Sequence, residues 1–192
     1  MTMASLYRTQ ANRLALIKRY KVVLTNSEYM RGEYIRNGVP PDHVITLPYC
    51  VLPLRPNTAD VPSAVTAETL SRNEWRLTFA GRMDAVKGGS TLVHVIPLLR
   101  ARTDKPLHLT MAGDGPCRSD WEAAALRVQA EVPNVNIKFT GWLNDEQLAT
   151  LFEDSDLLVV PSLWPEPFGI VGVQAGLQGL PAAAFNVGGI PT

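Results

Sequence analysis

From Arg76 onward, short apolar segments alternate with longer segments that carry helix signals, and this alternation constrains the fold of the 192-residue chain more than any other feature. The apolar segments have about four to six residues and the helical ones about ten to fourteen, which is typical of βαβ units and a parallel sheet. Right-handed crossovers then predict an α/β fold with a doubly wound, Rossmann-like parallel sheet, whose ligand binds outside the carboxyl ends of the strands. We expect its strands at residues 77–80, 107–112, 135–140, 157–160 and 182–185.

Helix signals lie between these strands and also before them. Ser27 and Asn144 are suited to cap helices, and Ser119 with Glu122 suggests a capping box. Helices are expected at residues 4–20, 28–36, 89–102, 119–131, 144–154 and 169–177, with short extra strands at 22–24 and 44–47.

The segment 48–73 contains several prolines and asparagines and shows little periodicity, which favours a linker or long loop. The sequence therefore predicts three parts, namely residues 1–50, a linker at 51–75 and a main domain at 76–192.

The charge balance excludes a global attraction to polyanions, since 18 Lys and Arg residues balance 18 Asp and Glu residues. Nucleic acid is therefore not expected as a partner, and any anion site must be local. Cys50 and Cys117 match no metal-ligand spacing and are expected to be reduced thiols of a cytoplasmic protein. Residues 1–10 lack the apolar core of a signal peptide, and no run approaches the ~20 apolar residues of a transmembrane segment.

The loop after the first main-domain strand, from Gly81 to Gly89, combines glycines with two cations at the start of a helix. A helix N-terminus attracts anions, and Arg82 and Lys87 would add a bidentate guanidinium and a point charge for a diphosphate. The alternative is that both are solvated surface cations.

The next loop contains Gly113-Asp114-Gly115, which resembles the start of a dinucleotide fingerprint. Arg118 occupies the third glycine position, and no acidic residue follows at the end of an adjacent strand, which argues against an NAD site. We interpret the loop as a tight turn that lets a ligand approach the backbone.

Glu166 lies between two prolines, which stiffen the backbone around its carboxylate. Phe168 and Gly169 follow and open a helix whose amides would face the same crevice. The alternative is that Glu166 is a solvated loop acid or a charge that complements the helix dipole. A Gly-Gly pair at 188–189 again permits close backbone approach after the last strand. Histidines show no ligand spacing, and the tryptophans are expected at the core or rim, with Trp164 nearest Glu166.

Taken together, these loops resemble those of the large group-1 (family 4) glycosyltransferases. The motifs that carry the resemblance are Asn26-Ser27-Glu28, Gly38-Val39-Pro40-Pro41-Asp42, Gly81-Arg82, Lys87-Gly88, Gly113-Asp114-Gly115, Phe139-Thr140-Gly141, Ser155-Asp156, Pro161-Ser162, Glu166-Pro167-Phe168-Gly169, Gly179-Leu180-Pro181 and Gly188-Gly189-Ile190-Pro191. Such enzymes have two Rossmann-like domains in a GT-B fold, of which the second binds the donor. They retain anomeric configuration and need no metal for donor binding, so the resemblance implies a UDP-, GDP- or ADP-sugar substrate and no further cofactor.

The resemblance also implies roles for individual residues. Arg82 and Lys87 would neutralise the leaving diphosphate, and Glu166 would hold the donor sugar. Backbone amides of Phe168, Gly169 and Ile170 would bind sugar and phosphate, while the loop around Gly141 to Leu143 would lie near the nucleobase. Gly81 and Gly113 belong to the same donor-binding set. The family has a second Glu eight positions after the first, at the ribose, where this chain has Gln174.

For the organisation of the protein, the resemblance makes residues 1–50 the remnant of an N-terminal acceptor domain. Residues 76–192 would be the donor domain, incomplete at its C-terminus. A hexosyl transferase is expected, with a glycan, lipid or small-molecule acceptor, and the chain alone should be inactive. The full-length enzyme could associate peripherally with the membrane. The alternatives are a non-catalytic nucleotide-sugar-binding module and a GT-B nucleotide-sugar epimerase.

Overall fold

The computed structural model describes residues 3–54 and 72–191, which form two compact units. Residues 55–71, on which most of the predicted linker at 51–75 falls, lie outside the described part. Within the described residues, the first unit comprises 3–50, 165–168 and 188–191, and the second comprises 51–54, 72–164 and 169–187. Each unit is therefore assembled from segments that are distant in the sequence.

The described part of the first unit contains two parallel strands, two α-helices and one 3₁₀ helix. Helix α1 (Met3–Ile17) is followed by β1 (Val23–Thr25), α2 (Glu28–Arg36), the 3₁₀ helix η1 (Pro41–His43) and β2 (Val44–Thr46). Strands β1 and β2 pair in register, and a small core of Val23, Val39 and Val44 lies beneath them. The side chain of Ser27 accepts the N–H of Met30, which confirms it as the cap of α2.

The second unit contains a five-stranded sheet in the order β5-β4-β3-β6-β7, with all neighbours parallel. The direction of the strand order reverses between β3 and β6, as in a Rossmann-like sheet. This confirms the predicted α/β, doubly wound fold. The elements are β3 (Trp75–Ala80), η2 (Ala85–Lys87), α4 (Gly89–Arg100), β4 (Leu107–Ala112), α5 (Arg118–Glu131), β5 (Val135–Gly141), α6 (Asp145–Glu153), β6 (Leu157–Val160), α7 (Ile170–Leu177) and β7 (Ala182–Ala184).

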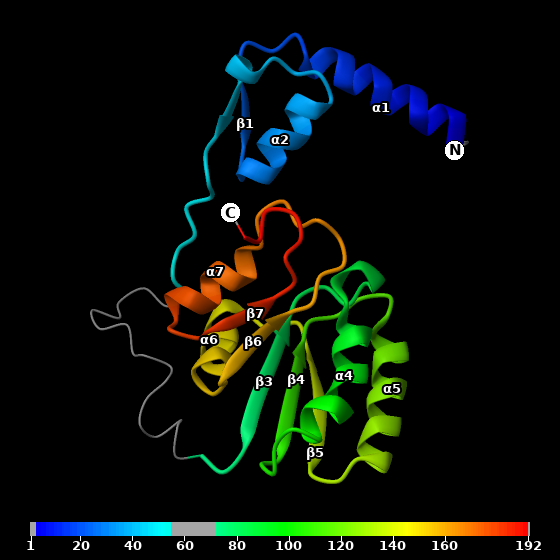
Figure 1. Cartoon of the computed structure of the whole chain (residues 1–192), viewed down its shortest axis with the longest axis vertical. Coiled ribbons are helices and arrows are strands. Elements are labelled where there is room, and N and C mark those ends of the chain that lie inside the picture. The colour runs from blue at the N-terminus through cyan, green and yellow to red at the C-terminus, as the bar shows by residue number, and fades with distance from the viewer. Residues whose placement is uncertain (1–2, 55–71, 192) are drawn as a thin grey trace. The chain divides into compact units, whose positions relative to one another are not determined.

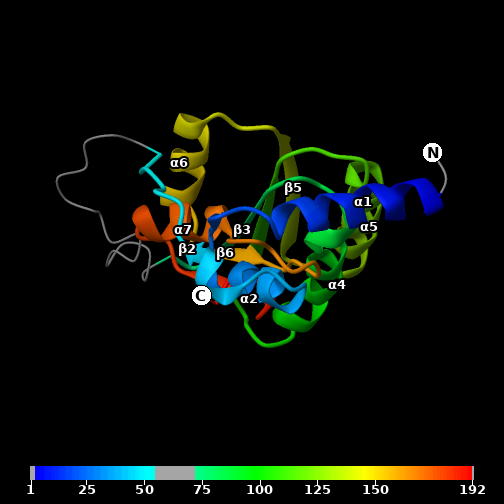
Figure 2. The same ribbon diagram turned by 90° about the horizontal axis from the view of Figure 1, so that it is seen from above.

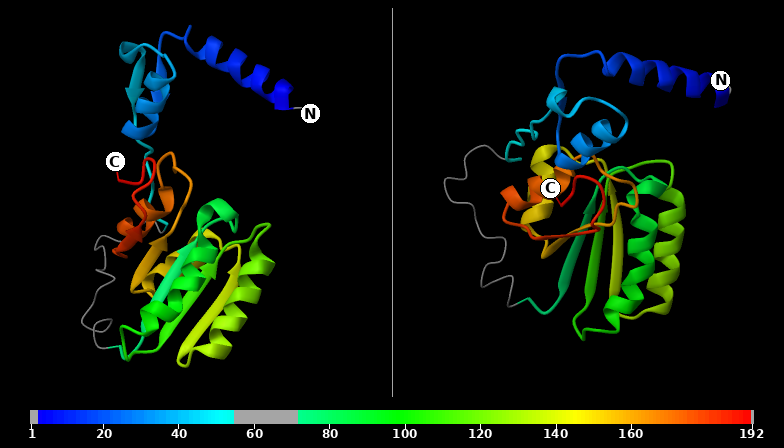
Figure 3. Two further views of the ribbon diagram at one scale, coloured as in Figure 1. Left: turned by 45° about the vertical axis from the view of Figure 1, so that its right-hand side comes forward. Right: turned by 45° about the horizontal axis from the view of Figure 1, so that its top comes forward.

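Helices cover both faces of this sheet. Helices α4 and α5 pack on one face, and α6 lies on the opposite side (Figures 1 and 2). Figure 3 shows α7 beside β6 and β7, away from α4 and α5. The main core lies between the sheet and α4–α5, where Trp121 packs edge-on against Phe79 with ring centroids 5.7 Å apart. Five of the six residues of β4 are buried, which explains why its apolar run is so clear in the sequence.

Of the helix caps predicted at Asn144 and Ser119, the first is confirmed and the second is wrong. Asn144 forms a full capping box with Gln147, as expected for the start of α6. The predicted box of Ser119 and Glu122 is wrong, because α5 already begins at Arg118 and its cap is Cys117, without a side-chain hydrogen bond. The Glu122 carboxylate instead accepts a hydrogen bond from Arg118 at 2.7 Å.

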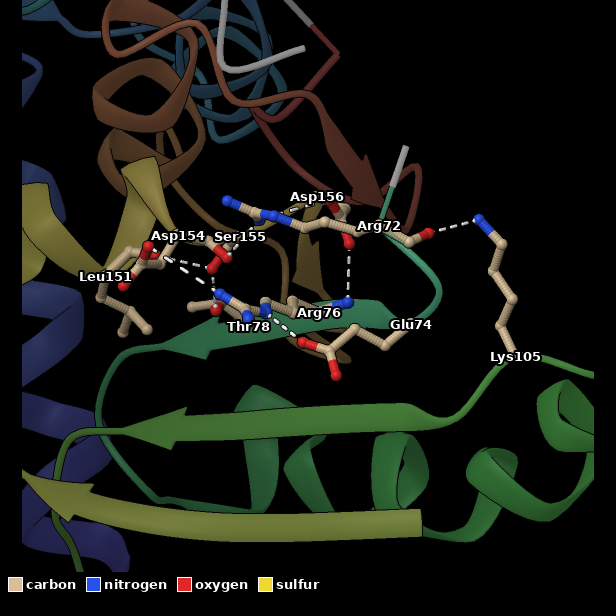
Figure 4. A network of polar contacts seen from close by, with 9 residues as sticks. All are labelled: Arg72, Glu74, Arg76, Thr78, Lys105, Leu151, Asp154, Ser155 and Asp156. Carbon is tan, nitrogen blue, oxygen red and sulfur yellow. Dashed lines mark hydrogen bonds and ion pairs between the residues drawn. The ribbon is translucent and has the colours of Figure 1, made fainter. Parts of the chain in front are cut away.

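At the opposite end of the sheet from the strand-end loops, a polar network joins β3, α6 and β6 (Figure 4). The Asp156 carboxylate accepts the backbone N–H of Arg76 at 2.7 Å and lies 3.8 Å from the Arg72 guanidinium. Ser155 is buried, contacts the hydroxyl of Thr78 at 2.6 Å and donates to the carbonyl of Leu151. The Ser155-Asp156 motif therefore connects the start of β6 to β3 by hydrogen bonds.

We expect Asp156→Ala to lower the free energy of unfolding by about 2 kcal/mol, because it leaves the Arg76 N–H without its charged acceptor. The side chain of Asp156 is only 9% exposed, so solvent screens this contact little. Urea denaturation of the chain measures the change. Asp154→Ala is the matched control, since that carboxylate is 65% exposed and its contact with Arg76 is 3.9 Å long. Equal losses for the two variants would contradict the assignment.

Candidate functional site

A pocket of about 250 Å³ lies at the carboxyl ends of β3 and β4 in the second unit. The loop after β5 and the helices α6 and α7 complete its walls. Five residues predicted for the site are brought together there, namely Gly81, Gly113, Leu143, Ile170 and Gln174. The other lining residues are Ala80, Ala112, Trp142, Leu148 and Val171. The pocket therefore occupies the strand ends at which a doubly wound sheet binds its ligand.

The lining is mainly apolar and contains no ionisable side chain. Polar side-chain atoms come from Gln174 and from the indole of Trp142, whose side chain is 67% exposed. A small apolar pocket with few polar groups suits a neutral, flat part of a ligand rather than an anion. The sequence predicted a core or rim position for the Trp142 side chain, and the resemblance placed its loop, from Gly141 to Leu143, near the nucleobase.

Gly113 sets the spacing of the strand ends around the pocket. Its backbone has φ +128°, and its N–H donates to the carbonyl of Gly141 at 2.8 Å. The N–H of Gly81 donates to the carbonyl of Ala112 at 3.0 Å. A Cβ at position 113 would lie 1.9 Å from the carbonyl oxygen of Gly81. The close approach predicted for a ligand at this turn is thus made by the preceding loop of the protein itself.

Arg118 holds the Gly113–Gly115 loop in place. Its Nη1 donates to the Asp114 carboxylate at 3.0 Å, and its Nε donates to Glu122. The N–H of Gly115 and then the Arg118 guanidinium lower the pKa of Asp114 below its usual value. The carbonyl of Asp114 also accepts the N–H of Met83 at 2.8 Å. Arg118, which fills the third glycine position of the incomplete fingerprint, therefore fixes this loop against the one that carries Arg82.

The cationic loop begins at Gly81 on the pocket wall and ends at the start of α4. Arg82 is 64% exposed at its side chain and lies 3.5 Å from the carboxylate of Asp84. Asp84 also accepts the N–H of Val86 and so begins η2, of which Lys87 is the last residue. Neither cation lines the pocket. An exposed ion pair is worth little, so Arg82 can reorient towards an anion.

Glu166 and Phe168 belong to the first unit, whereas Gly169 and Ile170 belong to the second. The ring of Phe168 packs edge-on against Tyr49, with centroids 5.4 Å apart. The carbonyl of Glu166 accepts the N–H of Gly189 at 2.6 Å. Gly169 is the cap of α7, and Ile170 is the first residue of that helix.

Within residues 3–54 and 72–191, no group of three or more His, Cys, Asp or Glu side chains is placed to hold a metal ion. In the same ranges, no helix combines the length and apolar character needed to cross a membrane. Cys50 is exposed and Cys117 is partly buried, and both are free thiols.

Known proteins that are similar to this chain in sequence include glycosyltransferases. An uncharacterised glycosyltransferase of Methanocaldococcus jannaschii is 30% identical over 118 residues, which cover 62% of this chain and 29% of that protein. A D-inositol 3-phosphate glycosyltransferase of Pseudarthrobacter chlorophenolicus is 34% identical over 117 residues, which cover 60% and 27%. The chain thus spans less than a third of these relatives.

Solved structures agree on the fold. Anabaena HepE, in a crystal structure with UDP and glucose, aligns with a TM-score of 0.69 and 23% identity, over 93% of this chain and 48% of HepE. This likeness supports a GT-B fold. The family model described as glycosyl transferases group 1 matches residues 64–192, well over half of the chain. The chain therefore belongs to the group 1 glycosyl transferases.

Proposed function

We propose that the chain is the donor-binding part of a retaining glycosyltransferase that transfers a hexosyl group from a nucleotide diphosphate sugar to an acceptor hydroxyl. The observation that carries this proposal is the pocket at the ends of β3 and β4, which adjoins the loop that contains Arg82 and Lys87. A neutral pocket and a neighbouring cationic loop match the two chemical parts of a nucleotide diphosphate. UDP is the preferred nucleotide because the HepE structure contains UDP.

In this proposal, the nucleoside occupies the pocket. The base lies against Trp142 and Leu143, and Gln174 hydrogen-bonds the ribose hydroxyls. The diphosphate contacts Arg82, Lys87 and backbone amides at the start of α7, where Gly169 and Ile170 lie. Glu166 binds the donor sugar. The ring of Phe168 packs against Tyr49 and so helps to hold the backbone next to Glu166 in place.

Negative charge grows on the diphosphate as its bond to the anomeric carbon stretches. Arg82 and Lys87 are then worth more in the transition state than in the ground state, which is the condition for catalysis. The acceptor hydroxyl attacks from the same face, and its proton passes to the departing phosphate. The proposal includes no metal ion and no cofactor.

Exposed apolar residues of the first unit favour the presence of an additional half of the enzyme that binds the acceptor. Leu24 and Ile45 of the unit's two-stranded sheet are 60% and 50% exposed, and Leu47, which follows β2, is 61% exposed. Met3 and Tyr7 of α1 are also exposed. A sheet of two strands is marginally stable by itself, so these apolar surfaces favour cover by further protein. We propose that the acceptor half of a GT-B enzyme covers them and binds a glycan, lipid or small molecule. Such an enzyme would act in the cytoplasm or peripherally at its membrane.

Calorimetry of the 192-residue chain with UDP, GDP and ADP, beside a transfer assay with the matching sugars, tests the proposal. We expect weak binding of UDP and no transfer, since positioning of two substrates contributes roughly 7–11 kcal/mol and needs both halves. Folded protein that binds none of the three nucleotides would contradict the proposal. A complete enzyme that releases UDP and an epimerised sugar without acceptor product would favour an epimerase. Binding without turnover by the complete protein would favour a non-catalytic module.

We expect Gln174→Glu to tighten UDP binding by about 1 kcal/mol, because a carboxylate accepts the ribose hydroxyls with charge assistance that an amide lacks. Gln174 lines the pocket and is partly buried. Titration calorimetry measures the dissociation constant. Gln10→Glu on exposed α1 is the matched control for the added charge. An unchanged or weaker affinity of the Gln174 variant would assign the residue to packing of α7.

A further inference from the structure

The Glu166 segment, defined as Pro165–Phe168, has few backbone groups with which to hold itself in place. Two of its four residues are prolines and have no N–H to donate. The segment also lies outside the helices and strands, so no regular ladder supports it. Its conformation must therefore depend on donors from elsewhere in the first unit.

Ser27 supplies one of these donors. Its hydroxyl donates to the carbonyl of Pro167 at 2.5 Å, across 140 positions of sequence. The same oxygen accepts the N–H of Met30 at 3.2 Å and so caps α2. Ser27 is only 3% exposed, which keeps both hydrogen bonds away from water. One hydroxyl therefore connects the start of α2 with the residue that follows Glu166.

Gly188 and Gly189 hold the segment from the other side. The N–H of Gly189 donates to the carbonyl of Glu166 at 2.6 Å. A Cβ at Gly189 would lie 2.2 Å from the Pro167 oxygen and 2.6 Å from the Ser27 hydroxyl. A Cβ at Gly188 would lie 2.3 Å from the carbonyl oxygen of Glu166. These distances show that neither Gly188 nor Gly189 has space for a Cβ.

We infer that Ser27 is a positioning residue for Glu166. It acts by fixing the Pro167 carbonyl, and thus the backbone from which the Glu166 carboxylate projects, in one arrangement. The inference rests on the proposed function, in which Glu166 binds the donor sugar. It assigns a role in sugar binding to a serine for which the residues themselves predicted a helix cap.

Three variants of the 192-residue chain separate the two roles of the hydroxyl. Ser27→Ala removes both hydrogen bonds, and Ser27→Thr retains both. Ser27→Asp keeps an acceptor for the Met30 N–H but has no hydrogen to donate to Pro167. Calorimetry with UDP and with UDP-glucose, UDP-galactose and UDP-N-acetylglucosamine gives the gain in affinity from the sugar. Hydrogen–deuterium exchange of peptides covering 165–170 and 186–191 reports on the segment directly.

We expect Ser27→Ala and Ser27→Asp to reduce the affinity gain from the best sugar by about five- to tenfold, the range of one lost hydrogen bond. Both should also speed exchange at Gly189. The affinity for UDP itself should change less than twofold, because the pocket lies in the second unit. Ser27→Thr should behave like the wild type. Should Ser27→Ala fail to fold, Ser27→Asp decides, since it keeps the cap.

Wild-type exchange and an unchanged sugar gain in Ser27→Asp would overturn the inference, as would failure of Ser27→Thr to restore both. A wild-type chain that binds UDP but gains nothing from any sugar would instead contradict the role proposed for Glu166. In that case the exchange data still decide whether Ser27 holds the segment, so the two failures are distinguishable.

Discussion

Replacing Arg82 or Lys87 by alanine in the complete glycosyltransferase is expected to lower kcat by about 10²–10³-fold, as for the loss of one preorganised donor to a developing negative charge. Both cations lie in the short loop between the pocket wall at Gly81 and the start of α4. The exposed ion pair of Arg82 with Asp84 hardly competes with a contact between Arg82 and the diphosphate, since such pairs contribute at most about 1 kcal/mol. Steady-state kinetics with saturating donor measure the loss.

The 192-residue chain allows a second measurement of the same cations. UDP should bind Arg82→Ala about tenfold more weakly, whereas uridine, which has no phosphate, should bind the variant and the wild type alike. Arg127→Ala is the matched control, because Arg127 is exposed on α5, outside the loop. Near-normal kcat in both variants, or equal weakening for UDP and uridine, would show that these are ordinary surface cations.

Gly113→Ala is expected to destabilise the chain by about 3 kcal/mol and to raise the dissociation constant for UDP at least about tenfold. The added Cβ would lie 1.9 Å from the carbonyl oxygen of Gly81, a backbone atom that cannot move aside cheaply. The positive φ of the residue adds strain for any L side chain. Separation of the two strand ends would then deform the pocket, because Gly81 and Gly113 both line it.

Gly172→Ala is the control for this substitution. A Cβ at Gly172 meets no atom within 4 Å, and the residue lies inside α7. We expect Gly172→Ala to stabilise the chain by up to about 1 kcal/mol, since alanine has a higher helix propensity than glycine. Thermal and urea denaturation measure stability, and calorimetry measures UDP affinity. Equal behaviour of the two alanine variants would refute the role given to Gly113.

Strands β3 and β4 were predictable because consecutive residues in each are buried, so both appear as continuous apolar runs. The pocket was predictable in part, since parallel strands bring their carboxyl ends together whatever the side chains are. The resemblance placed the loop from Gly141 to Leu143 near the nucleobase, but an isolated aromatic residue gives no sign of whether it faces the core or a ligand, so Trp142 itself was not singled out. The capping box predicted at Ser119 is wrong because the cap of α5 is Cys117, two residues earlier, and Glu122 pairs with Arg118 instead.

The glycine motifs could be recognised but not interpreted from the sequence. Close approach requires a glycine whether the approaching group is a ligand or another loop, and here Gly113 approaches Gly81 while Gly189 approaches Pro167. The contact between Ser27 and Pro167 spans 140 positions. A pairing at such separation leaves no periodic trace, so only the folded arrangement reveals it.

The interleaving of the two units has a practical consequence for anyone who shortens this protein. The family match begins at residue 64, so it suggests a boundary for recombinant expression that would discard residues 1–63. Such a cut would keep the whole sheet of the second unit and the pocket at its edge. It would also remove Ser27 and Tyr49, which contact Pro167 and Phe168, and leave the Glu166 segment without those supports. Truncated protein of this kind should still capture nucleotide on an affinity resin but discriminate poorly among sugars.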